Sequence, residues 1–107
     1  PFLLQPYEKA NWVVQWDRET GEEIRRFVGH DGGVWALDVS KDGRWLASSD
    51  DAGQLILWDL ATGSPMRRNH THTAPAFDLT LSPDDQTVYS VSADETLVAW
   101  HIGDPSL

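Results

Sequence analysis

The segment Leu55-Ile56-Leu57-Trp58-Asp59 decides the fold, because it is one of three similar segments at a fixed spacing. It is a short apolar run that ends in Trp-Asp. The same ending occurs at Trp16-Asp17, and a close variant occurs at Trp100-His101, so the three tryptophans lie 42 residues apart. Self-similarity with a period of about 40–45 residues is typical of repeat architectures. The chain is therefore expected to contain copies of one structural unit.

A shift of 42 residues aligns two copies of this unit from Arg18 to His101 without an insertion. Identical residues fall at turns and at anchors of the apolar runs, while the positions between them vary. A duplicated structural unit leaves this pattern. The identities include Gly21/Gly63, Arg25/Arg67, His30/His72, Ser48/Ser90 and Trp58/Trp100.

Short runs every eight to twelve residues or so, joined by Gly, Asp and Pro turns, predict an all-β fold. The run at 2–7 is the weakest, because Pro6 cannot donate a ladder hydrogen bond. The runs 55–58 and 97–100 are apolar on both faces, so their sheets must be covered on both sides, as the blades of a β-propeller are. The expected strands are 2–7, 12–16, 23–28, 34–39, 45–49, 55–58, 65–69, 76–81, 87–91 and 97–100.

The order of motifs resembles the WD40-repeat family. The first copy reads Gly29-His30, Ser40-Lys41-Asp42-Gly43 and Leu55-Ile56-Leu57-Trp58-Asp59, and the second reads Thr71-His72, Ser82-Pro83-Asp84-Asp85 and Leu97-Val98-Ala99-Trp100-His101. The resemblance covers about residues 11–101. It implies an all-β, WD40-type β-propeller fragment with antiparallel four-stranded blades.

The expected organisation is the end of a partial blade at 1–28, a blade with the Gly-His and Trp-Asp motifs of the repeat at 29–69, and a second blade at 70–107 that lacks a clear outer strand. Such propellers close with about four to eight blades. Two and a half blades cannot close a ring, and the chain begins without Met. Further blades are expected from a longer parent chain or from other subunits.

The resemblance also implies a buried hydrogen-bonded tetrad of His, Ser, Asp and Trp in each blade. By position, the second copy has all four members, whereas the first has Ala52 where the acid is expected. The second copy is therefore expected to be the better anchored of the two. The tetrad residues are His72, Ser90, Asp94 and Trp100 in the second copy and His30, Ser48 and Trp58 in the first.

Composition argues against several classes of function. The net charge is −9 and the pI is about 4.6, so binding to nucleic acid or to an anionic membrane is disfavoured. The absence of cysteine excludes disulfides and thiolate metal sites. The apolar runs are too short to span a membrane, and no signal peptide is recognisable, which slightly favours a cytoplasmic location.

No metal, cofactor or catalytic residue is predicted. The pair His70 and His72 resembles a metal-binding spacing, but His72 belongs to the repeated tetrad. Adjacent carboxylates at Asp50-Asp51 and Asp84-Asp85 are better explained as turn formers than as an acid–base pair. No phosphate-binding loop and no nucleophile motif is present.

Two further pairs of features recur at matching positions. Arg25-Arg26 and Arg67-Arg68 are interpreted as protection of an outer strand edge, and the alternative interpretation is a phosphate-binding strip. Trp35 and Phe77 are interpreted as packing between blades and not as ligand-stacking residues.

These features favour a non-catalytic platform for protein–protein interaction. The acid-rich turns favour a partly basic partner. Two alternatives remain open: a regulatory or substrate-binding propeller of a larger enzyme or redox protein, and a structural subunit of a large assembly. The candidate partner-binding residues are Asp31, Gly32, Asp50, Asp51, Thr73 and Glu95.

Overall fold

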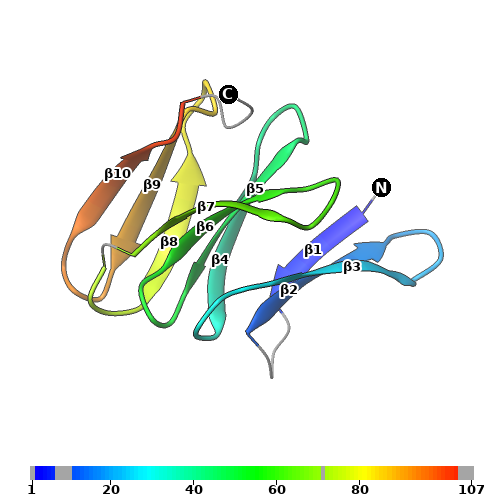
Figure 1. Cartoon of the computed structure of the whole chain (residues 1–107), viewed down its shortest axis with the longest axis horizontal. Coiled ribbons are helices and arrows are strands. Elements are labelled where there is room, and N and C mark those ends of the chain that lie inside the picture. The colour runs from blue at the N-terminus through cyan, green and yellow to red at the C-terminus, as the bar shows by residue number, and fades with distance from the viewer. Residues whose placement is uncertain (1, 7–10, 71, 104–107) are drawn as a thin grey trace.

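The computed structural model describes residues 2–6, 11–70 and 72–103, and the described chain consists of antiparallel β-strands (Figure 1). The prediction of an all-β fold is confirmed. Predicted features at residues 1, 7–10, 71 and 104–107, which include Tyr7, Thr71 and most of the C-terminal tail, lie outside the described residues. The strands are β1 (Phe2–Pro6), β2 (Trp12–Asp17), β3 (Glu23–Val28), β4 (Val34–Val39), β5 (Trp45–Asp50), β6 (Leu55–Asp59), β7 (Pro65–Asn69), β8 (Ala76–Leu81), β9 (Thr87–Ser92) and β10 (Leu97–His101).

The strands form three sheets that stand side by side like blades (Figure 1). The first sheet has the order β1-β2-β3, the central sheet β4-β5-β6-β7, and the third sheet β10-β9-β8. Within each sheet the paired strands are consecutive in the sequence, whereas β3 and β4, and β7 and β8, belong to different sheets. Within the described residues only the central sheet has four strands. Because neighbouring strands are antiparallel, successive turns within a sheet lie at opposite ends of that sheet.

The core lies between the sheets, on both faces of the central one. Successive residues of a strand point to opposite faces. Leu46 and Ile56 therefore pack against Val13 and Phe27 of the first sheet, whereas the residues next to them pack against the third sheet. The cluster on that second face consists of Trp45, Ala47, Leu55, Leu57, Ala76, Leu79, Val88 and Ile102.

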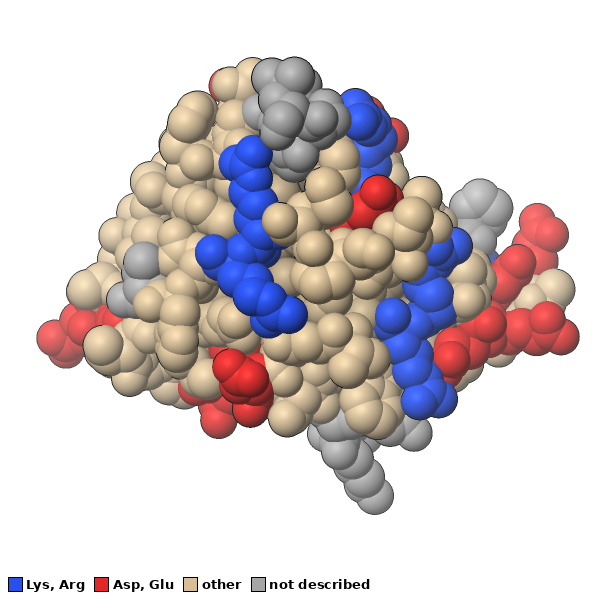
Figure 2. Space-filling view, viewed as in Figure 1, with Lys and Arg blue, Asp and Glu red and all other residues tan. Residues whose placement is uncertain are grey.

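Arginines of the outer strands also connect neighbouring sheets. The side chain of Arg25 on β3 donates to the carbonyl of Ala61, beyond β6, and Arg67 on β7 donates to the carbonyl of Ile102, beyond β10. The interpretation of the arginine pairs as edge protection is therefore incomplete, since one member of each pair joins two blades. Figure 2 shows two stripes of basic side chains where β3 and β7 lie in Figure 1, and a separate basic group near the upper edge.

No helix within the described ranges is long and apolar enough to cross a membrane.

The turn between β5 and β6 packs against the segment that leads into the third sheet. Gly53 has a φ of 85°, and a Cβ atom there would lie 2.4 Å from the carbonyl oxygen of His72 and 2.8 Å from that of Ala74. Both contacts are with backbone atoms, which cannot rotate away. The approach of the second and third sheets at this point therefore requires glycine.

Gly53→Ala is expected to lower the free energy of unfolding of the full-length protein by about 2 kcal/mol or more, because backbone strain and a steric clash add together. Gly43→Ala is the matched control. Gly43 has a similar φ of 74° but nothing within 4 Å of its Cβ position, so only the strain of about 1 kcal/mol should appear. Chemical denaturation measures both values, and equal losses would contradict the close approach.

Candidate functional site

A buried hydrogen-bond network ties the strands of the central sheet to the loop before it. His30 lies between β3 and β4, with Nδ1 2.7 Å from Oδ2 of Asp50 and Nε2 2.5 Å from the hydroxyl of Ser48. The indole of Trp58 donates to the same hydroxyl at 2.8 Å. These contacts fix the orientation of the imidazole, with Nδ1 facing the carboxylate of Asp50 and Nε2 facing the hydroxyl of Ser48. Every polar group of the network has a partner.

The acid of this network is Asp50, and the expectation that the first copy lacks its acid at Ala52 is wrong. Asp50 is the last residue of β5, and its side chain turns inward beneath the turn. Its Oδ1 also accepts the amide hydrogens of Ala52 and Gln54, at 3.0 and 2.8 Å. Its side chain is fully buried, so the prediction that Asp50 contacts a partner is wrong as well.

The second network is less complete. His72 contacts the hydroxyls of Ser90 at 2.7 Å and Thr96 at 3.0 Å, and the carboxylate of Asp94 at 3.2 Å. Trp100 is half-buried, and no hydrogen bond joins its indole to Ser90, although both residues are described. The expectation that the second copy is the better anchored is therefore not met. A physical reason is visible in the sheets: β7 covers the edge of β6, while no described strand covers β10.

Both acids of the networks are stabilised as carboxylates. Burial opposes ionisation of Asp50, but hydrogen bonds from His30 and from the amide of Gln54 outweigh it and lower the pKa of the carboxyl. The hydroxyl of Thr96 is the main cause that lowers the pKa of Asp94, with the amide of Thr73 and His72 adding to it. Both carboxylates are therefore charged acceptors at neutral pH.

The loops and turns at one end of the central and third sheets form a continuous surface, which we call the loop face (residues 29–35, 50–54, 70, 72–77 and 92–96). It follows the lower edge of Figure 1. Asp51 donates its amide to the carbonyl of Gly33 at 2.8 Å, and Ala93 donates to Pro75 at 3.1 Å. The close approach of Gly53 to the carbonyl oxygens of His72 and Ala74 joins the part of this face on the central sheet to the part on the third sheet.

Most of the predicted partner-binding residues lie on this face. The structure places Asp31, Asp51, Thr73 and Glu95 in exposed positions and Gly32 in a half-buried one. A Cβ atom at Gly32 would lie 3.0 Å from the Cβ of Asp51, so the glycine lets the loop rest directly on the turn.

Trp35 and Phe77, which the sequence analysis interpreted as packing between blades, lie on the loop face. Trp35 and Phe77 are 53% and 45% exposed, and neither belongs to a core cluster of the described residues, so within these three sheets they do not pack between blades. Each sits where the pairing of an inner strand is irregular, between Val34 and Ala36 and between Ala76 and Asp78. Such a bulge redirects a side chain. Their matching positions were the only signal in the sequence.

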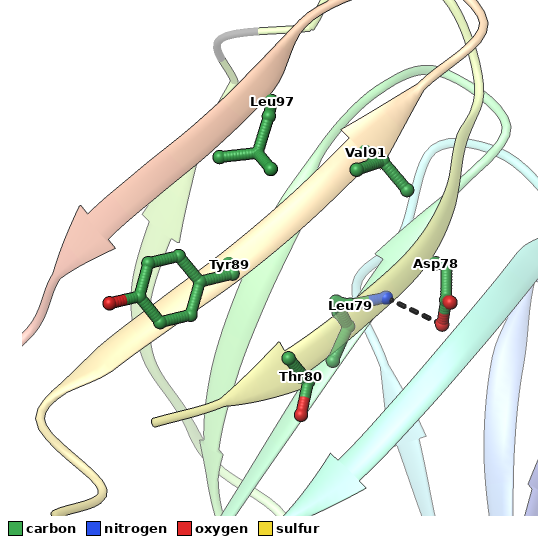
Figure 3. A pocket seen from close by; sticks show the side chains of 6 residues that line it. All are labelled: Asp78, Leu79, Thr80, Tyr89, Val91 and Leu97. Carbon is green, nitrogen blue, oxygen red and sulfur yellow. Dashed lines mark hydrogen bonds between the residues drawn. The ribbon is translucent and has the colours of Figure 1, made fainter. Parts of the chain in front are cut away.

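A second exposed apolar surface lies on the third sheet. Leu97 and Tyr89 are 66% and 41% exposed, beside a shallow pocket of about 170 Å³. Figure 3 shows the side chains that line the pocket, Asp78, Leu79, Thr80, Tyr89, Val91 and Leu97. A shift of 42 residues places this surface on the face of the central sheet that the third sheet covers. It therefore has the form of a sheet-packing face.

The described residues contain no group of three or more His, Cys, Asp or Glu side chains that could hold a metal ion. His70, which had suggested such a site, has Nε2 2.9 Å from the carbonyl oxygen of Ala52.

Packed antiparallel sheets with this succession define part of a β-propeller. The family model "WD domain, G-beta repeat" (WD40) matches residues 21–59 and 63–101, and the chain belongs to this family. The propeller domain of Cps50 (Swd1) from Myceliophteria thermophila has a similar structure, with a TM-score of 0.87 and 28% sequence identity over 97% of this chain. The chain spans 33% of that structure. No curated protein matches the sequence.

Asp50→Ala is expected to lower the free energy of unfolding by about 2–3 kcal/mol, because it strands the buried His30 and the amides of the turn. Asp94→Ala should cost less, since its network is partly exposed. Ala52→Asp should not stabilise, because the added carboxylate would lie close to Asp50. Denaturant titration of the full-length protein ranks the three variants, and a larger loss for Asp94→Ala would contradict the assignment.

Stability should fall on acidification below about pH 5. A carboxyl whose pKa is lower in the folded state stabilises the fold above its unfolded pKa of 3.8, and this contribution is lost as pH falls through the folded pKa. The Tm of Asp94→Asn should therefore change less between pH 5 and pH 3 than that of the wild type. Melting curves at both pH values measure the difference, and equal changes would show that Asp94 does not contribute.

Proposed function

We propose that the chain is part of a non-catalytic WD40 scaffold that binds protein partners on its loop face. The observation that carries the proposal is the pair of exposed aromatic side chains, Trp35 and Phe77, at matching positions of neighbouring sheets. Large aromatic residues contribute strongly to protein interfaces. Binding residues on loops that a rigid scaffold holds in place are a common arrangement.

The loop face is well suited to this role because hydrogen bonds to the strands hold its loops in place. His30 and His72 stand at the base of the two loops, and their networks reach into β5 and β9. A loop that is already ordered loses little conformational entropy when a partner binds. The net charge of −9 supports a protein partner over a nucleic acid.

The apolar face of the third sheet supports a second kind of contact, with a further blade. Leu97 and Tyr89 occupy the positions that Leu55 and Ala47 occupy in the central sheet, where both residues are buried by the next sheet. The chain also spans only a third of the similar propeller domain. The missing blades would come from a longer parent chain or from another subunit.

The docking function is tested with the tagged full-length protein, purified from its own cells, and quantitative mass spectrometry of the proteins that accompany it. The double variant Trp35→Ala/Phe77→Ala should lose at least one partner that the wild type retains. Glu22→Ala, an exposed position in the β2–β3 turn at the opposite end of the sheets, should retain it. An unchanged set of partners in the double variant would contradict the proposal, provided that its Tm matches the wild type.

A further inference from the structure

Trp35 and Asp51 form a surface pair of an aromatic ring and a carboxylate. The indole N–H of Trp35 on β4 donates to Oδ1 of Asp51, in the β5–β6 turn, at 3.0 Å. This bond fixes the orientation of the ring while about half of its surface stays exposed. No hydrogen bond from the described residues reaches Oδ2 of Asp51, so that oxygen is available to an additional donor.

The pair exists in only one of the two blades, and the tetrad explains why. Asp50 supplies the buried acid of the central sheet, which leaves Asp51 free to point outward. In the third sheet the acid is Asp94, and the position equivalent to Asp51 is Ala93. Phe77 therefore has no carboxylate at the matching place. The two exposed aromatic residues differ in chemistry although they share a position.

Acids predominate on the loop face, and a basic side chain that reaches its edge is Arg68 of β7, which donates to the carbonyl of Gly29 at 2.7 Å. The exposed acids Asp31, Asp51 and Glu95 lie on the loop face, and residues 29–35, 50–54, 70–77 and 92–96 contain no lysine or arginine. Acidic side chains, and no basic ones, mark the lower left edge of Figure 2. The basic residues of the central and third sheets lie on β7 and near the β4–β5 turn, at Lys41, Arg44, Arg67 and Arg68.

We propose that Trp35 and Asp51 form a subsite for the side chain of a lysine or arginine in a basic segment of the partner protein. A cation within about 6 Å of an indole face is attracted by the quadrupole of the ring. The carboxylate beside the ring attracts the same cation and can accept its hydrogen bond. The exposed acids Asp31, Asp51 and Glu95 on this face favour a basic segment over an acidic one. The subsite rests on the proposed docking function of the loop face.

The probe is a short glycine–serine peptide with one central arginine, and the comparison peptide carries citrulline, which has a similar shape and no charge. Both are titrated into the full-length protein while the indole N–H signal of Trp35 is followed by NMR. The signal is assigned by its loss in Trp35→Phe. The arginine peptide should move this signal and the citrulline peptide should not. Equal movement with both peptides would overturn the proposal.

Asp51→Asn isolates the contribution of charge, because an amide oxygen can still accept the indole N–H. It should weaken binding of the arginine peptide by about fivefold. Phe77→Ala is the matched control, since it removes an exposed aromatic residue that has no carboxylate beside it, and it should change the affinity by less than about twofold. Unchanged affinity in Asp51→Asn would overturn the subsite.

The two proposals fail in different ways. Loss of a cellular partner in Trp35→Ala/Phe77→Ala without any response to the arginine peptide would refute the cationic subsite and leave the docking function standing. A charge-dependent response to the peptide, with no cellular partner lost from the double variant, would support the subsite and refute the docking function.

Discussion

Burial of the central sheet on both faces is the constraint on which the rest of the structure depends. Leu46 and Ala47 are neighbours in β5, yet one packs against the first sheet and the other against the third. Apolar burial contributes about 25 cal/mol per Å² of surface removed from water, so the central sheet needs both neighbours. The third sheet has the same kind of face at Leu97 and Tyr89. Each sheet that covers its neighbour therefore has an apolar face of its own that a further sheet must cover.

The same constraint also buries polar side chains of the central sheet, which then need hydrogen-bond partners within the protein. Every residue of β5 is buried, including Ser48 and Asp50. A buried carboxylate destabilises a fold unless it is hydrogen-bonded. His30, Trp58 and the amides of the turn satisfy the two side chains completely. Because His30 belongs to a loop, the same hydrogen bonds also hold that loop in place, and the proposed docking surface is therefore ordered by the core.

The period of the sequence predicted most of the fold, because turns and apolar anchors keep their spacing when a unit is duplicated. The strands end within one or two residues of their expected bounds, for example at Asp50 instead of Ser49. The acid of the first tetrad could not be found in this way. Alignment by 42 residues pairs Asp94 with Ala52, whereas the turn geometry brings Asp50 to the same contact with histidine. Spacing along the chain does not record how a turn redirects a carboxylate.

The exposure of Trp35 and Phe77 was missed for a related reason. Strict alternation would turn these side chains toward a neighbouring sheet, but the strand pairing shifts at each of them. Such irregularities are local and leave no mark on the period. The same is true of Asp51, which is free to contact Trp35 only because the residue before it completes the tetrad. The repeat therefore determines the scaffold, while departures from the repeat distinguish one blade from the next. A partner that distinguishes one blade from the other would have to contact residues that differ between them, such as Asp51 and Ala93, and these residues lie on the loop face.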